Sequence, residues 1–219
     1  MTFRLWERWG SLLGVLAVVC WIVAFGVGGS SPDTGDSDAK IASYYASHSH
    51  QVRQIIAWFI FFAGILIFLG FLTALRSRLL AAEGQGGRLA ALAYGSGLLS
   101  AALWTVALSA FQAPAFLAND TRVADLDPRA FRIFNDFGYE IWVAAVIVGA
   151  VVLWATAALA LRTAVLPRWF AWISIVAGFV LLFAVVFIPV FVYWGWVVVA
   201  GVLLAWRRPA AEATAATAR

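Results

Sequence analysis

The sequence predicts an all-α fold, a compact polytopic membrane bundle of six transmembrane helices with two short helices in its outer loops. The 219 residues are 64% hydrophobic and only 12% charged, which is too little charge to cover a soluble globule of this size. Several apolar runs reach about 20 residues, the length that crosses a bilayer with every backbone polar group bonded inside its own helix. Arginine or acidic residues flank these runs.

The first span is predicted over residues 11–28, after Arg4 and Arg8. We interpret it as an uncleaved span, because it is longer than the apolar region of a signal peptide and the segment after Gly26 matches a cleavage site poorly. Cys20 follows Val19, whereas a lipoprotein signal has a small residue there. As the only cysteine it forms no intrachain disulfide.

The next three spans are predicted over 55–75, 89–111 and 141–161. The last apolar run is too long for one helix, and it contains Pro189, which removes a backbone donor. Two short spans, 169–187 and 190–206, joined by a tight outer turn, are therefore expected. The whole forms one membrane domain, residues 1–208, with a flexible cytoplasmic tail at 209–219.

Charge predicts the orientation of the bundle. With both termini in the cytoplasm, ten of the 15 Lys and Arg residues lie on the inner side and eight of the 11 acidic residues lie outside. This is the positive-inside pattern. Fourteen arginines against one lysine, with abundant alanine, glycine and valine, indicate a GC-rich bacterial genome. The sequence thus predicts a multi-pass protein of the bacterial cytoplasmic membrane.

The two long connections, 29–54 and 112–140, both fall outside and form an acidic outer cap. In the first, Asp36, Ser37 or Asp38 is expected to cap a helix over 39–48. In the second, Asp127 is expected to cap a helix with Pro128 at its first position. Each of these helices is expected to run or bend into the span that follows it.

An 80-residue spacing separates Arg8, Arg88 and Arg168, each of which opens an outward-going span. Asp-x-Asp pairs at 36/38 and 125/127 precede the ends of two returning spans. Three parallel hairpins would explain the pattern, and so would chance similarity in an Ala-, Leu- and Arg-rich chain.

The main candidate polar cluster lies where the second cap helix enters the membrane. It comprises Asn135, Asp136, Tyr139 and Glu140, with Arg132 and Arg53 as candidate cationic partners. Asp136 and Glu140 are one turn apart and repel each other unless a cation lies near. One interpretation is a structural ion pair that fixes the cap on the bundle. The other is a polar pocket, open to the outside, for a cationic or amide-bearing ligand.

His48 and His50 form a weaker candidate metal site. Ligands two residues apart point to different sides of a helix, so a solvated, capped helix is the favoured interpretation. The spans carry no ionisable residue near their centres except Cys20, which argues against an energised transporter. No catalytic residue, cofactor or metal is predicted. The arginines are scattered over the loops, which argues against nucleic-acid binding.

The 12 tryptophans gather largely at the ends of the predicted spans, for example Trp58, Trp142, Trp169, Trp194 and Trp206. Indole rings favour the membrane–water interface. We therefore expect them to be belt anchors rather than the walls of a ligand site. Small residues within the spans, such as Gly14, Ser100 and Gly178, predict close helix packing.

Several segments together resemble a group of uncharacterised six-span integral membrane proteins from GC-rich bacteria. They are Leu75-Arg-Ser-Arg-Leu-Leu-Ala-Ala-Glu-Gly, the arginine-led third span, Asn135-Asp-Phe-Gly-Tyr, Arg162-Thr-Ala-Val-Leu-Pro-Arg-Trp-Phe-Ala-Trp, Pro32-Asp and Tyr44-Tyr-Ala-Ser-His. The resemblance covers nearly the whole chain and rests on motifs of moderate specificity. It implies the six-span layout and adds no chemistry.

Three functional hypotheses follow, with the lipid bilayer as the common partner. The first is a non-enzymatic protein that binds or scaffolds a protein partner through the acidic outer cap. The second is a passive carrier or binder of a lipid-like or small apolar molecule near Asp136 and Glu140. A membrane enzyme is the third, and it would require the histidines and outer acids to converge.

Overall fold

The computed structural model describes residues 2–120 and 126–206, and every regular element within them is a helix. The helices are α1 (Thr2–Gly28), α2 (Asp38–Ala46), α3 (His48–Glu83), α4 (Arg88–Asn119), α5 (Pro128–Arg162), α6 (Arg168–Leu181), the 3-10 helix η1 (Ala184–Val186) and α7 (Pro189–Trp206). The predicted tail at 209–219 and Asp125 lie outside the described residues.

Five helices, α1, α3, α4, α5 and α7, are long and apolar enough to cross a membrane. The chain is therefore a multi-pass membrane protein. The expected span 169–187 is shorter than predicted, because α6 has 14 residues and ends at Leu181, before a turn and η1. A helix of this length extends about 21 Å, against a hydrocarbon core of about 30 Å.

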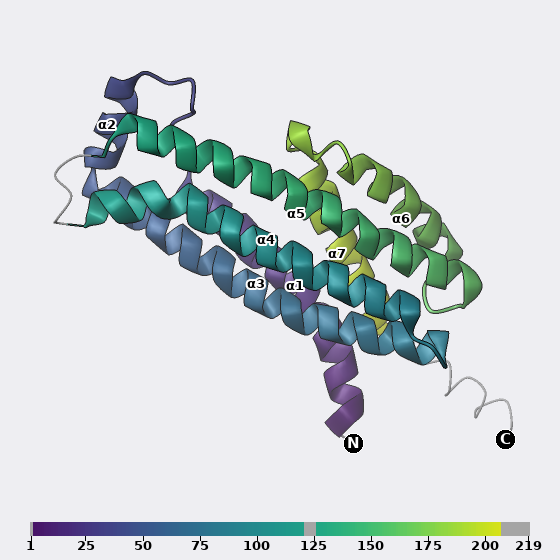
Figure 1. Ribbon diagram of the computed structural model, residues 1–219. Helices are drawn as coiled ribbons and strands as arrows, with labels where there is room; N and C mark the ends of the chain where they lie inside the picture. The colour runs from purple at the N-terminus through teal and green to yellow at the C-terminus, as the bar shows by residue number, and fades with distance from the viewer. Residues whose placement is uncertain (1, 121–125, 207–219) are drawn as a thin grey trace, which may run out of the picture.

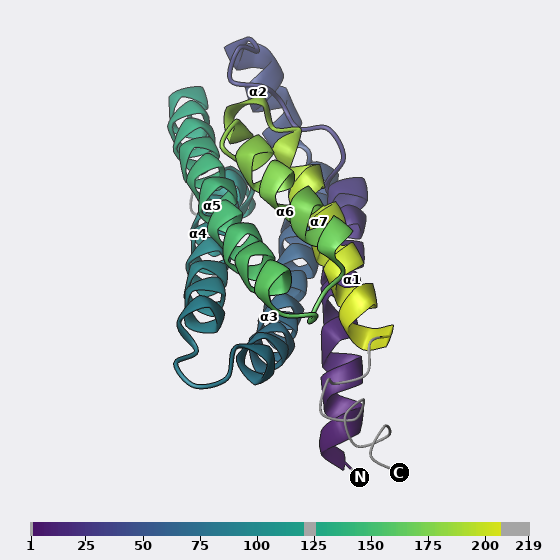
Figure 2. The ribbon, with the colours of Figure 1, turned by 90° about the vertical axis from the view of Figure 1, so that its right-hand side faces the viewer.

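The six helices α1, α3, α4, α5, α6 and α7 form a closed ring. α3 packs against α1 and α4, α5 packs against α4 and α6, and α7 packs against α6 and α1. Figures 1 and 2 show this arrangement, with the separate short helix α2 at one end of the bundle, here called the α2 end. Consecutive long helices therefore pair as three hairpins, which is compatible with the predicted repeat and does not test it.

Aromatic side chains fill the space that the six helices enclose. Trp21 of α1, Trp104 of α4 and Trp142 of α5 are buried, and the Trp21 and Trp104 ring centroids are 4.8 Å apart. Tyr193 and Trp194 of α7 pack into the same cluster. The interpretation of the tryptophans as belt anchors is therefore wrong for Trp142 and Trp194, which are 2% and 3% exposed. Trp169 and Trp206 are exposed, as a belt requires.

Small residues set the helix spacing, as the sequence predicts. The Ser100 hydroxyl donates to the carbonyl of Ala145 at 2.7 Å and ties α4 to α5. Gly178 lies against the indole of Trp154, and Gly201 of α7 lies against the backbone of Ser11 in α1, where an added Cβ would be 2.6 Å from the Ser11 carbonyl oxygen. Side chains at these positions would push the helices apart.

Local signals explain where the helices begin and end. The Ser37 hydroxyl accepts from the Lys40 backbone N–H and caps α2, and the Asp127 carboxylate accepts from the Arg129 N–H with Pro128 in the first turn of α5. Gly84 ends α3 with φ +73°. Both predicted caps are confirmed. Thr34 and its neighbours before α2 belong to no helix.

The cap helices differ from the expectation in one respect. The second cap helix runs straight into its span as the first turns of α5, as expected. The first bends into its span at Ser47, where an extended conformation divides the predicted helix 39–48 into α2 and the start of α3. α2 is thus the one separate cap helix among the described residues.

The helices differ in length. α3, α4 and α5 have 36, 32 and 35 residues, and helices of this size extend about 48–54 Å. The turn between α6 and α7 reaches only the middle of α5, where the Tyr139 hydroxyl donates to the Val185 carbonyl and Phe187 stacks on Trp142. The turns of α5 before Tyr139 therefore extend past α6 and α7 toward the α2 end (Figure 1).

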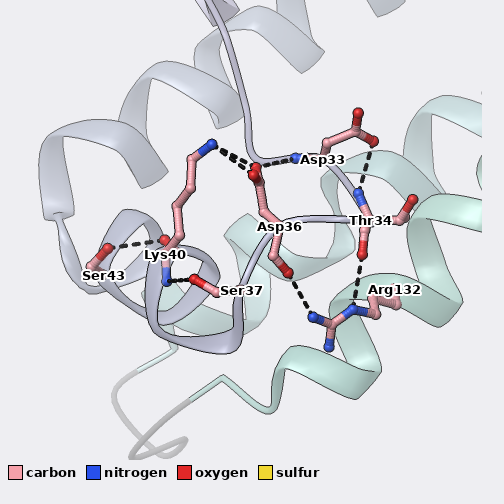
Figure 3. A network of polar contacts seen from close by, with 7 residues as sticks. All are labelled: Asp33, Thr34, Asp36, Ser37, Lys40, Ser43 and Arg132. Atoms are coloured by element: carbon pink, nitrogen blue, oxygen red, sulfur yellow. Dashed lines mark hydrogen bonds and ion pairs between the residues drawn. The ribbon is translucent and has the colours of Figure 1, made fainter.

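Arg132 of α5 clamps the loop before α2. Its Nε donates to the Thr34 carbonyl at 3.0 Å, and its Nη2 donates to the Asp36 carbonyl at 2.8 Å and pairs with the Asp38 carboxylate at 2.7 Å. Figure 3 shows these carbonyls turned toward the guanidinium. The Lys40 ammonium holds the pKa of the Asp36 carboxyl below its usual value. The stability from that contact is present at neutral pH and is lost as pH falls through the acid range.

Close packing at Gly201 gives the first prediction. Gly201→Ala should lower the free energy of unfolding in detergent by about 1–3 kcal/mol, because the new Cβ meets backbone that cannot move aside. Gly195→Ala in the same helix is the control, since nothing lies within 4 Å of its added Cβ. Equal melting temperatures for the two variants would contradict close packing of α1 against α7.

The clamp gives the second prediction. Arg132→Gln should raise hydrogen exchange of backbone amides in 33–46 by about tenfold, because charge-assisted bonds to carbonyl and carboxylate groups hold this loop. Arg129→Gln, an exposed arginine one turn earlier, should leave exchange unchanged. The same increase in both variants would mean that net charge, rather than the clamp, holds the loop.

Candidate functional site

A cavity of about 220 Å³ lies near the α2 end of the bundle. It is enclosed by α1, α3, α4 and α5, with Tyr45 of α2 and Phe187, which follows η1, completing its wall. The lining residues Phe25, Gly29 and Ser31, in and after α1, are exposed. The cavity therefore opens on the α1 side.

Eight of the 17 residues that line the cavity are aromatic. Phe61 and Trp142 come from the central aromatic cluster and meet at ring centroids 5.9 Å apart, so the core of the bundle forms part of the cavity wall. The aromatic lining residues are Phe25, Tyr45, Trp58, Phe61, Phe111, Phe131, Trp142 and Phe187. Such a wall binds apolar or planar groups by surface burial and ring contacts.

The polar part of the wall is neutral. Three carboxamides line the cavity, Gln54 of α3, Gln112 of α4 and Asn135 of α5, and no lining residue that the structure describes is charged. Gln54 is 7% exposed. A charged molecule would lose its hydration here without gaining a counter-charge from the wall.

The glutamines form a hydrogen-bonded chain. Gln54 Nε2 donates to the Gly28 carbonyl at 3.2 Å and to the Tyr44 hydroxyl at 2.9 Å. Gln112 Nε2 donates to Gln54 Oε1 at 3.1 Å. The chain links α1, α2, α3 and α4, and it holds the two amides rigidly in the cavity wall.

A small second core supports the cap above the cavity. Ile41 and Tyr45 of α2 pack against Ala115 of α4 and Phe131 of α5, and the rings of Tyr45 and Phe131 are 5.6 Å apart. Gln51 donates to the Tyr45 carbonyl at 2.6 Å. Burial raises the pKa of the Tyr45 hydroxyl, which stays protonated at neutral pH. The cap therefore adds no charge to the cavity.

The structure divides the predicted polar cluster. Asn135 lines the cavity, and Tyr139 bonds to the turn after α6. Asp136 and Glu140 are exposed on the opposite side of α5, and within the described residues neither has a hydrogen bond or ion pair. The four side chains therefore do not converge on one pocket.

The two expected cationic partners bind other groups. Arg132 clamps the loop before α2, as described above. Arg53 donates from Nε to the Val27 carbonyl at 3.1 Å and from Nη2 to the Gly28 carbonyl at 3.4 Å. It thus covers free carbonyls at the end of α1, a usual role for a cation at a helix C-terminus.

The two histidines lie in the first turn of α3. His48 is exposed, and His50 stacks on Tyr44 at 4.2 Å with its Nδ1 3.1 Å from the Tyr44 carbonyl. Across residues 2–120 and 126–206, no three His, Cys, Asp or Glu side chains gather as metal ligands. The stacking gives His50 a structural role at the break between α2 and α3.

Sequence reasoning found Asn135 but missed the two glutamines of the cavity wall. Gln54 and Gln112 are 58 positions apart and meet only in the folded bundle. The available signal was the presence of amides at the ends of apolar runs, where a polar side chain either faces water or has a buried partner. Trp58 and Trp142, expected as belt anchors, also line the cavity.

Comparison with known proteins agrees with the resemblance seen in the sequence. No curated protein and no solved structure is found to be similar to the chain. One family model, described as a domain of unknown function (DUF4386), matches residues 10–214. Because this match covers nearly all of the chain, the protein belongs to the DUF4386 family.

Proposed function

We propose that the protein is a non-enzymatic binder or passive carrier of a small, uncharged, largely apolar molecule, which occupies the aromatic cavity at the α2 end. The observation that carries the proposal is the neutral wall of aromatic rings and carboxamides. Pockets for small molecules commonly combine apolar walls with a few convergent polar groups.

The size of the cavity limits the ligand. An engineered protein cavity of about 150 Å³ holds benzene, and this cavity measures about 220 Å³. A substituted benzene or a bicyclic ring is the expected size. A longer lipid-like molecule would extend through the opening beside Phe25 and Ser31.

The proposed topology brings the cavity to the outer surface of the bacterial cytoplasmic membrane. Six crossings, with α6 and α7 as the short last pair and both termini inside, agree with the arginine distribution. In this topology the outer boundary lies near Tyr139 and Trp142, and the cavity receives its ligand from the outer interface.

A second candidate is a protein partner bound by the exposed face of α5. Asp136 and Glu140 lie on this face, and Ile133 and Phe137 are 68% and 53% exposed beside them. Apolar side chains rimmed by carboxylates are typical of interaction surfaces. This candidate keeps the cap hypothesis but confines it to the part of the cap that α5 provides, since Asp36 and Asp38 are paired with Lys40 and Arg132.

Filling the cavity tests the first candidate. Toluene at saturating concentration should raise the melting temperature of the detergent-purified protein by mass action, and Asn135→Phe should abolish that shift. Asn135 suits the test because its side chain lines the cavity and has no hydrogen bond to a described residue.

The matched control is Asp136→Asn/Glu140→Gln, which alters the neighbouring exposed face and should retain the toluene shift. If the wild-type protein shows no shift, or Asn135→Phe retains it in full, the cavity is not the binding site. Loss of the shift in the carboxylate variant alone would place the ligand on the exposed face of α5.

Cysteine labelling tests the topology. In a Cys20→Ser background, His48→Cys and Val186→Cys should react with a membrane-impermeant maleimide on spheroplasts, because the model of six crossings exposes both outside. Gln85→Cys, in the turn between α3 and α4, should react only after lysis. Reaction of Val186→Cys only after lysis would mean that α6 and α7 do not cross.

A further inference from the structure

Asn135 lies on the face of α5 that borders the cavity. Its neighbours Phe131, Gly138 and Trp142, one or two turns away along the helix, are all buried. Because successive residues of an α-helix are about 100° apart, Asn135 lies within about 60° of each of them around the helix axis. Phe131 and Trp142 line the cavity, as Asn135 does. The Asn135 side chain therefore projects toward the cavity between these two aromatic residues.

The amide of Asn135 is uncommitted and accessible. Asn135 is half-buried, so it retains accessible surface. Within the described part of the chain, neither its Oδ1 nor its Nδ2 has a hydrogen-bond partner, and neither atom is shielded from solvent. Because this side chain borders the cavity, a molecule bound there can contact both atoms.

The other two carboxamides of the wall are already hydrogen-bonded to the protein. Gln54 Nε2 donates to the Gly28 carbonyl and to the Tyr44 hydroxyl. Gln54 Oε1 accepts from Gln112 Nε2. These bonds fix both glutamines to the bundle. Asn135 is therefore the lining carboxamide that is left to bind a ligand.

An amide side chain holds one acceptor and one donor side by side in a plane. A second carboxamide can pair with it through two parallel N–H···O bonds. A hydroxyl group carries its donor and acceptor on a single atom, so it cannot face both atoms with good geometry. A ketone offers only an acceptor. A carboxylic acid is ionised at neutral pH and would lose its hydration beside an uncharged wall.

We propose that the ligand is an uncharged carboxamide or lactam on an apolar ring or chain, and that Asn135 selects it by one donated and one accepted hydrogen bond. This inference rests on the proposed function and names the ligand class of the same cavity. The aromatic rings of the wall bury the apolar part of such a molecule. Of the cationic and amide-bearing ligands expected from the sequence, the neutral wall favours the second.

Benzamide and isopropylbenzene test the inference, because they share a ring and nearly the same size and only benzamide carries an amide. Binding is measured by titration calorimetry on the detergent-purified full chain. Each variant is compared with the wild type in the same detergent, so partitioning of the ligand into micelles cancels. Asn135→Leu replaces the amide by an apolar group of similar size. It should weaken benzamide binding by about tenfold or more, through the loss of two hydrogen bonds, and change isopropylbenzene binding by less than about threefold.

Asn119→Leu is the matched control, since it makes the same substitution at an exposed asparagine at the end of α4, outside the cavity. It should change neither affinity. Equal weakening of both ligands by Asn135→Leu, or unchanged benzamide binding, would overturn the role of Asn135. Binding of isopropylbenzene but not benzamide to the wild-type protein would overturn the amide class and leave the proposed function intact, whereas binding of neither would overturn the proposed function itself.

Asn135→Ala serves if Asn135→Leu fails to fold, because it removes the amide without adding atoms. The same loss of benzamide binding is expected. Acetophenone, which has a methyl group in place of the NH₂ of benzamide, tests the second hydrogen bond. The ratio of benzamide affinity to acetophenone affinity should fall by about fivefold in Asn135→Ala, since only benzamide loses two bonds. An unchanged ratio would mean that Asn135 recognises the carbonyl group alone, which would overturn the amide class.

Discussion

Hydrocarbon offers no hydrogen bonds, so each segment that crosses it must bond its backbone polar groups internally, and this constraint decides where polar chemistry can lie in the chain. α3, α4 and α5 are longer than a bilayer requires, whereas α6 and α7 are not. The excess turns gather at the α2 end. There the chain has buried glutamines, a clamped loop and a separate helix, features that the apolar middle of the bundle lacks.

The aromatic core explains why the cavity forms at that end. In the middle of the bundle six helices close a ring around Trp21, Trp104 and Tyr193, and large rings fill the space. The turn between α6 and α7 stops level with Tyr139 and Trp142 of α5. Beyond it four long helices surround a volume that Phe187 and Tyr45 only partly fill. The cavity is thus a consequence of unequal helix lengths.

The charged groups near the cavity do not line it. Arg132, Asp36 and Asp38 hold the loop before α2, and Arg53 covers carbonyls at the end of α1. Asp136 and Glu140 face away. What remains at the wall is three carboxamides, of which Gln54 and Gln112 are hydrogen-bonded to each other. A neutral site results, and it lacks the carboxylates of the polar pocket for a cationic or amide-bearing ligand that was one of the two interpretations of the sequence.

The sequence by itself determined the helical membrane class, the start of α5 at Asp127 and Pro128, and a cap for α2 at one of residues 36–38, because span length and capping depend on residues close together in the chain. Only the tertiary structure decided the partners of Arg132 and Arg53, the burial of Trp142 and Trp194, and the meeting of Gln54 with Gln112. The physical reason is that the sequence leaves the rotation of each helix about its own axis undetermined. A helix that is apolar on every face does not reveal which side turns inward, and lipid does not force the choice. That choice is made by close contacts between helices, such as Gly201 against Ser11, which join residues far apart in sequence.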